Sequence, residues 1–245
     1  MKADPTRQLR LLELQSLDTT LTQLNHRAKS LPEHAEIASL RTALEELDSA
    51  VVRTSTERGD LQREVRKADN DVQLVRDRAE RDRKRLEAGV GSAKDLQGLQ
   101  HELESLARRQ AVLEDAELEV MERAETAESA AEQAQEQHMQ TEQRLAELQS
   151  RREALIADLE SQRAEVASGR AELVEAVGAD LVALYDRIRA HSGTAAAALV
   201  RRSCGGCNME LGAVELGRIA EADDDEVLRC EDCGRILVRT PESGV

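Results

Sequence analysis

The 245-residue sequence contains no phenylalanine, no tryptophan and a single tyrosine, Tyr185. Its apolar residues are mostly alanine and leucine, so large aromatic side chains cannot fill a thick globular core. Proline is almost as rare, because the three prolines at positions 5, 32 and 241 leave residues 33–240 without one. These absences disfavour an ordinary α/β enzyme and permit very long helices.

The sequence also lacks long apolar runs and an excess of positive charge. No window reaches the roughly 18 consecutive apolar residues of a membrane-spanning helix, and Arg10 and Glu13 interrupt the first leucines where a signal peptide stays apolar. A formal net charge of −15 disfavours attraction of the whole chain to nucleic acid or to an anionic membrane. We therefore expect a cytoplasmic protein without a membrane partner.

Two long stretches repeat apolar residues at alternating spacings of three and four. The first runs from Ile37 to Leu86, with clear breaks only at Arg58 and Asp82, and the second starts at Leu96. A 3.5-residue period held over several heptads predicts a left-handed coiled coil. The glycines and serine of residues 89–92 separate the two stretches and suit a tight reversal, which predicts an antiparallel helical hairpin.

An earlier apolar repeat between Leu14 and Leu31 ends at Pro32, which predicts a kink near residues 30–33 and leaves open whether the base has two or three helices. We expect a mainly α fold with two domains. Residues 1–190 form the coiled-coil hairpin, with its turn near 88–95, and residues 191–245 form a small β-containing zinc ribbon.

The four cysteines supply the strongest chemical signal in the sequence. Cys204 and Cys207 form one CxxC pair and Cys230 and Cys233 form another, with 22 residues between the pairs. Two such turns supply the four thiolates of a tetrahedral zinc site, and in a reducing compartment this pattern indicates metal ligands rather than disulfides. A Zn(Cys)₄ centre has no open position for water or substrate, so we predict one structural Zn²⁺. Loss of zinc is expected to unfold the ribbon and to spare most of the hairpin.

Basic side chains mark two further candidate sites. Arginines flank the cysteines and are predicted to stabilise the thiolates, although solvated surface positions explain them equally well: Arg201, Arg202, Arg229 and Arg235. Other basic residues surround the predicted hairpin turn: Arg81, Arg83, Lys84, Arg85 and Lys94. They either pair with acidic residues of the coiled coil or form a surface that docks a partner. The ribbon itself is acidic at residues 223–226, which favours a basic protein face over phosphate.

Three segments resemble the bacterial proteins that join a coiled-coil hairpin to a C4-type zinc ribbon, the FlgZ-like family. They are residues 91–103 (GSAKDLQGLQHEL), 180–188 (DLVALYDRI) and 230–237 (CEDCGRIL). The resemblance implies a hooked hairpin carrying a zinc ribbon and acting as a non-enzymatic adaptor. Relatives are associated with the sigma factor RpoN, with flagellar or secretion components, and with RNA.

We consider three hypotheses for the function of this sequence. The leading hypothesis is an adaptor for a protein partner, such as a sigma factor or other transcription machinery, with no catalysis and no small-molecule substrate, because no phosphate loop or nucleophile motif is present. The alternative is RNA or DNA binding through the basic tip or the ribbon. A factor that enters the RNA polymerase secondary channel is the third, but Asp95 beside Lys94 is a poor match for the paired acidic residues of such tips.

Overall fold

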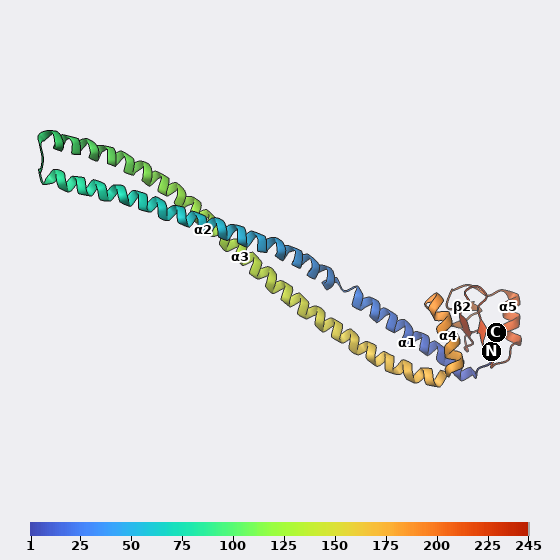
Figure 1. Cartoon of the computed structure of the whole chain (residues 1–245). Coiled ribbons are helices and arrows are strands. Elements are labelled where there is room, and N and C mark those ends of the chain that lie inside the picture. Colours follow the sequence, from blue (N-terminus) through green and yellow to red (C-terminus); the bar gives the residue numbers. More distant parts are fainter. Residues whose placement is uncertain (245) are drawn as a thin grey trace. The chain divides into compact units, whose positions relative to one another are not determined.

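The computed structural model describes residues 1–244, and most of them are helical (Figure 1). In chain order the elements are α1 (Pro5–Lys29), α2 (Pro32–Glu87), α3 (Ala93–Val177), α4 (Ala179–Ser192), β1 (Ala196–Val200), β2 (Ser203–Cys204), α5 (Ala213–Glu221), β3 (Leu228–Arg229) and β4 (Ile236–Val238). The predicted mainly α fold, with a long helical hairpin and a small strand-containing ribbon, is confirmed. Within residues 1–244, no helix combines the length and the apolar character that crossing a membrane requires.

The chain packs as two compact units. One is Ala35–Gln149, called here the hairpin unit; the other, called the base unit, joins Met1–His34 to the residues from Ser150 onwards. The sequence placed its division between residues 190 and 191. In the structure, buried side chains from both sides of that position share one core, because α4 packs against the strands that follow it.

The hairpin unit is built on the two predicted apolar repeats. Buried positions recur along α2 and α3 in the predicted register: Leu61, Val72, Ala79, Leu99, Ala127, Ala131 and Ala134. Gly89 and Gly91, with φ of 65° and 138°, form the reversal between the helices. Ser92 and Asp95 then cap the first turn of α3: the Ser92 backbone N–H donates to the Asp95 carboxylate at 2.9 Å and the Asp95 N–H donates to the Ser92 hydroxyl at 3.3 Å. This is a capping box.

The residues that break the first apolar repeat are explained by ion pairs. Arg58 reaches Glu128 on the facing helix at 3.3 Å, and the buried Asp82 lies 3.9 Å from Arg78 and 3.7 Å from Arg85. Further basic and acidic side chains meet between the helices: Arg76 with Glu114, Arg78 with Glu102, Arg123 with Glu64, and His138 with Asp48. Charge pairing along the coiled coil, one of the two expected explanations, therefore accounts for these side chains of α2 and α3.

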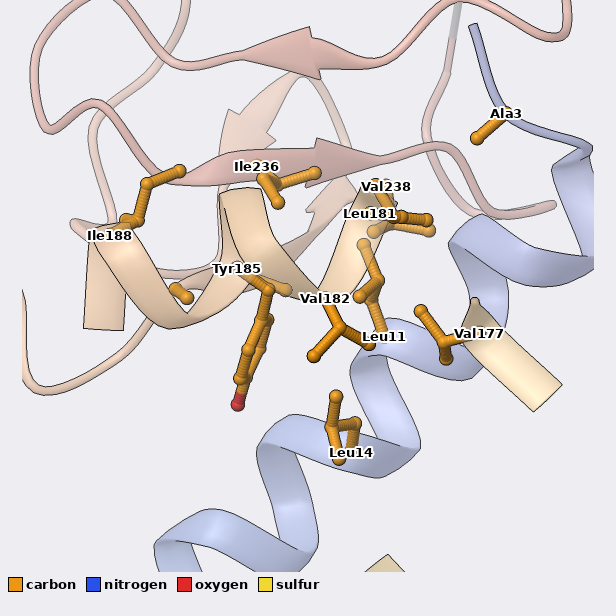
Figure 2. Close-up of a cluster of buried hydrophobic side chains, with 12 residues drawn as sticks. Ala3, Leu11, Leu14, Val177, Leu181, Val182, Tyr185, Ile188, Ile236 and Val238 are labelled. Atoms are coloured by element: carbon orange, nitrogen blue, oxygen red, sulfur yellow. The ribbon is translucent and has the colours of Figure 1, made fainter. Parts of the chain in front are cut away.

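The core of the base unit surrounds the only tyrosine. Tyr185 and Leu181 of α4 are fully buried, with Leu11 and Leu14 of α1 on one side and Ile236 of β4 on the other (Figure 2). Helix α4 therefore lies between the first helix of the chain and the ribbon sheet. Tyr185 is the one aromatic side chain in this core, and the side chains that surround it are small or aliphatic.

The sheet has the strand order β2-β1-β4-β3. Strand β1 pairs in parallel with β4, with Ala196 opposite Ile236, and antiparallel with β2. Alanine is a poor strand former, so the sequence did not indicate β1. The strand is held from outside the sheet, since the side-chain oxygen of Gln15 on α1 accepts from the backbone N–H groups of Ala195 at 2.6 Å and Ala196 at 3.3 Å.

One buried carboxylate joins the helices of the base unit. The side chain of Asp18 on α1 is fully buried. It accepts from the Tyr185 hydroxyl at 2.9 Å, and it pairs with Arg170 of α3 at 2.7 Å and with Arg189 of α4 at 3.0 Å. A buried charge is tolerated only when it is paired and hydrogen-bonded, so this carboxylate fixes where α1, α3 and α4 meet.

Replacing Asp18 therefore tests the packing of the base unit. We expect Asp18→Ala to lower the free energy of unfolding by about 3 kcal/mol, because it leaves two partly buried guanidinium groups without their carboxylate. The matched control is Asp186→Ala, which removes the exposed second partner of Arg170 and should cost less than about 1 kcal/mol. Chemical denaturation of both variants measures the difference, and equal costs would contradict a central role for Asp18.

Candidate functional site

The two CxxC segments adopt the same local turn. The N–H of Asn208 donates to the Cys204 carbonyl at 2.8 Å, and the N–H of Gly234 donates to the Cys230 carbonyl at 2.8 Å. Both donors have left-handed backbone angles, with φ of 59° and 72°. Asparagine and glycine are the residues that adopt this conformation most readily, which explains their positions directly after each pair. We call each CxxC turn a knuckle.

The two knuckles bring all four sulfurs together. The Sγ atoms of Cys204, Cys207, Cys230 and Cys233 lie within 4.8 Å of one another. The separations are 3.8 Å between Cys204 and Cys233 and 3.9 Å between Cys207 and Cys230. A tetrahedron with Zn–S bonds of about 2.3 Å has S···S edges of about 3.8 Å. The donor set and its spacing therefore fit one Zn²⁺ bound by protein ligands alone.

Glycines let the first knuckle approach the sheet. A Cβ atom on Gly205 would lie 2.9 Å from the Ala198 carbonyl oxygen, and one on Gly206 would lie 2.7 Å from the Arg235 side chain. The Gly205 N–H donates to that same Ala198 carbonyl at 2.9 Å. Only glycine fits between the knuckle and strand β1, so the sequence Cys-Gly-Gly-Cys is a packing requirement as well as a turn signal.

The thiols differ in how readily they ionise. Burial raises the pKa of Cys204 and raises that of Cys230 to about 12. Burial acts in the same direction on Cys233, but hydrogen bonds from the backbone and side chain of Arg235, together with those from neighbouring thiols, outweigh it and lower the pKa to about 7. Zinc binds the thiolate form, so metal binding must release protons and must weaken as the pH falls.

The flanking arginines occupy different positions around the knuckles. Arg235 donates through Nε to the Thr194 hydroxyl at 2.6 Å and to the Thr194 carbonyl at 3.2 Å. Arg229 donates through Nε to the Gly234 carbonyl at 2.9 Å and so closes the second knuckle. Stabilisation of a thiolate stays a prediction for the four arginines, and the lowered pKa of Cys233, which lies two residues before Arg235, agrees with it at that position.

Arg201 and Arg202 have another role. They form the two-residue loop between β1 and β2, and both have positive φ, 47° and 63°. Their backbone N–H groups donate to the carbonyls of Glu242 and Ser243 at 2.8 and 2.9 Å. Within residues 1–244 we find no hydrogen bond from either side chain to a cysteine, and both residues are exposed. This loop holds the C-terminal segment against the ribbon.

Sequence reasoning missed a buried carboxylate beside the second knuckle. Glu215 on α5 is only 8% exposed, and its Oε1 accepts from the Glu231 backbone N–H at 3.1 Å. It therefore connects α5 to the loop between Cys230 and Cys233. The apolar spacing of Leu216 and Ile219 marks the buried face of α5, but no local signal separates Glu215 from the exposed acidic residues of this segment.

The acidic loop of the ribbon contacts the N-terminus of the same chain. Lys2 pairs with Asp223 at 2.8 Å and with Asp225 at 3.0 Å. The N–H of Ala3 donates to the Asp225 carbonyl at 2.7 Å. The sequence suggested that this loop attracts a basic partner. In the structure the chain's own N-terminal segment contacts part of the loop, and a basic partner for the rest of it stays a prediction.

The predicted partner-binding residues are all exposed near the hairpin turn: Arg81, Arg83, Lys84, Arg85 and Lys94. Lys84 pairs with Glu80 at 2.7 Å, and Arg85 lies 3.7 Å from Asp82. Among residues 1–244, we find no ion pair to Arg81, Arg83 or Lys94. Part of the basic tip is thus neutralised within α2, and part remains available to a partner.

Zinc content and its dependence on one ligand test the candidate metal centre. We expect the purified chain to bind one zinc ion, and Cys204→Ser to lose it and unfold the ribbon, because structural zinc binding supplies roughly 10 kcal/mol of folding free energy. The matched control is Asp232→Ala, which changes an exposed non-ligand residue inside the second knuckle and should retain zinc. Metal analysis and circular dichroism measure both, and retention of zinc by Cys204→Ser is the contrary result.

Comparisons with known proteins agree with this architecture. A family model described as a CT398-like coiled coil hairpin domain matches residues 14–193, and one for a C4-type zinc ribbon domain matches residues 203–237. The chain is 39% identical to the uncharacterized protein Rv2229c of Mycobacterium tuberculosis over 98% of each chain.

Solved structures show the same fold. A Mycobacterium smegmatis protein is 36% identical, with a TM-score of 0.78 over 98% of this chain and 100% of that chain. CT398 from Chlamydia trachomatis has a TM-score of 0.60 at 19% identity, over 96% of this chain and 98% of its own, and so shares the fold. The resemblance inferred from the three sequence segments is confirmed, and the chain belongs to the family of CT398-like coiled-coil hairpin proteins that carry a C4-type zinc ribbon.

Proposed function

We propose that the protein is a non-enzymatic adaptor that presents its helical hairpin and its zinc ribbon to a protein partner in the cytoplasm. The observation that supports this most strongly is the four-cysteine cluster, whose sulfurs are spaced to fill every position of a tetrahedral ion. A metal held in this way stabilises a fold and offers no position to substrate. The proposed function is therefore carried out by exposed surfaces that bind a partner.

The hairpin unit suits such a role because it is built from long stretches of α2 and α3, which expose extended side-chain surfaces. Exposed apolar residues accompany charged ones on it, including Val90 in the turn, which is 78% exposed. A turn that combines Val90 with Arg81 and Lys94 offers both an apolar contact and charge to a protein surface. The resemblance to FlgZ-like proteins makes a sigma factor or another transcription component the first partner class to test.

Nucleic acid binding by the hairpin tip is the second candidate. The observation that favours it is that Arg81, Arg83 and Lys94 are exposed and have no ion-pair partner among the described residues. Phosphate contacts made by such side chains add up and weaken steeply with salt. The acidic residues next to them, Glu80 and Asp82, oppose this function.

A tagged pull-down from native lysate, with and without nuclease, tests the two candidates. The wild type is compared with Cys204→Ser and with a tip variant in which Arg81, Arg83, Lys84 and Arg85 are all changed to glutamate. The matched control reverses four exposed basic residues elsewhere on α2 with the same change in charge: Arg41, Arg53, Arg66 and Lys67.

The adaptor function predicts a defined protein that is recovered after nuclease treatment, lost with the tip variant or with Cys204→Ser, and retained with the control. RNA recovery that disappears with nuclease, with added salt and with the tip variant would instead establish the second candidate. Loss of the partner with the control as well would show that total charge, not the tip, determines recovery.

A further inference from the structure

A small cavity lies where α4 meets the second knuckle. Its volume is about 250 Å³, and it is lined on the α4 side by Leu184, Arg187, Ile188, His191 and Ser192 and on the ribbon side by Arg229, Cys233 and Gly234. The α4 residues share one helix face, because they recur at spacings of three and four. We call this cavity the knuckle pocket.

The charged side chains of the knuckle pocket are basic, although the chain is acidic and Cys233 belongs to a metal centre with a formal charge of −2 when zinc is bound. The chain carries a net charge of −15, yet the pocket wall contains two arginines and a histidine and no carboxylate. Within residues 1–244, neither Arg187 nor Arg229 makes an ion pair. Arg229 uses only its Nε, which donates to the Gly234 carbonyl, so its terminal nitrogens are available to a ligand.

The pocket also has an apolar part. Ile188 is 8% exposed and belongs to the core around Tyr185, and Leu184 packs partly buried against the same core. Because their other sides are held by the core, these two side chains form a fixed apolar floor. A ligand for this pocket therefore needs an apolar side chain next to a carboxylate.

The pocket is smaller than most cofactor sites. Small-molecule sites usually occupy about 300–1,000 Å³, and this cavity is below that range. A single aliphatic side chain with an adjoining carboxylate fits it better. Guanidinium groups recognise carboxylates through paired, charge-assisted hydrogen bonds, which supply orientation as well as attraction.

We propose that the knuckle pocket binds an acidic peptide segment of the protein partner, with a leucine-type side chain on Leu184 and Ile188 and a carboxylate between Arg187 and Arg229. This inference rests on the adaptor function and assigns it a surface. The site is built jointly by α4 and the second knuckle, so it exists only when the ribbon is folded.

Two short peptides provide the test. The acidic probe is acetyl-Glu-Leu-Glu-amide, and the neutral control of the same shape is acetyl-Gln-Leu-Gln-amide. Ligand-observed NMR titration with the zinc-loaded full chain measures both. We expect the acidic probe to bind with a dissociation constant on the order of 1 mM, and the neutral probe at least about 10-fold more weakly, because it lacks the charge-assisted contacts.

Variants connect the binding to the pocket. Arg187→Ala should weaken the acidic probe by about 10-fold, Arg187→Lys should restore part of the affinity by keeping the charge, and Arg163→Ala, an exposed arginine on α3, should have no effect. Zinc content is measured for each protein. Absence of saturable binding, equal binding of the two peptides, or equal effects of Arg187→Ala and Arg163→Ala would overturn the proposal.

Loss of zinc in Arg187→Ala would also overturn it, because the arginine would then serve the metal centre and not a ligand. The outcome is separable from that of the adaptor function. A partner that is recovered equally by the wild type and by Arg187→Ala leaves the adaptor standing and removes the knuckle pocket as its docking site. Peptide binding without any recovered partner would support the knuckle pocket as a binding site and contradict the adaptor function.

Discussion

The buried carboxylate of Asp18 is the constraint on which the base unit depends. A fully buried charge is strongly unfavourable unless other groups pair with it, and here the groups that do so come from two other helices: Arg170 from α3, and Tyr185 and Arg189 from α4. Satisfying this one side chain therefore fixes the meeting point of α1, α3 and α4. Burial and the hydrogen bond to Asp18 raise the pKa of Tyr185, so the network also keeps the phenol protonated well into alkaline pH.

The zinc ribbon depends on the same core. Strand β1 receives hydrogen bonds from Gln15 on α1, and Ile236 of β4 packs beside Tyr185. A zinc ion bound by the four cysteines in turn ties strands of the sheet together, because Cys204 lies in β2, Cys230 directly follows β3 and Cys233 precedes β4. The metal centre and the helical base thus stabilise each other, while the hairpin unit has its own apolar repeat and its own ion pairs.

Those parts that depend on local pattern could be predicted from the sequence. The apolar repeats predicted the long helices, Gly89 and Gly91 predicted the reversal, and the CxxC pairs predicted four clustered sulfurs. The rest depends on residues far apart in sequence. Asp18 looks like a solvated residue within a leucine repeat, and nothing near it indicates an arginine 152 positions later. Strand β1 is an alanine run whose strand conformation comes from Gln15 and β4, not from its own propensity. Glu215 likewise resembles its exposed acidic neighbours until α5 is placed against the knuckle.

We infer that the zinc centre and the helical base share a single cooperative core. Because Tyr185 is the only tyrosine and there is no tryptophan, the absorbance of its ionised form reports on that core without interference.

The decisive measurement is an alkaline titration of Tyr185 in the zinc-loaded protein, in the protein after chelation of zinc, and in the denatured protein. Denatured chain should ionise near pH 10, about the ordinary value for tyrosine, and the zinc-loaded protein should ionise at higher pH because its folded-state pKa is raised. The free energy of unfolding therefore falls once the pH rises above the pKa of tyrosine in the denatured chain. We predict that chelation moves the titration toward the denatured curve. An unchanged titration after complete zinc removal would contradict the shared core.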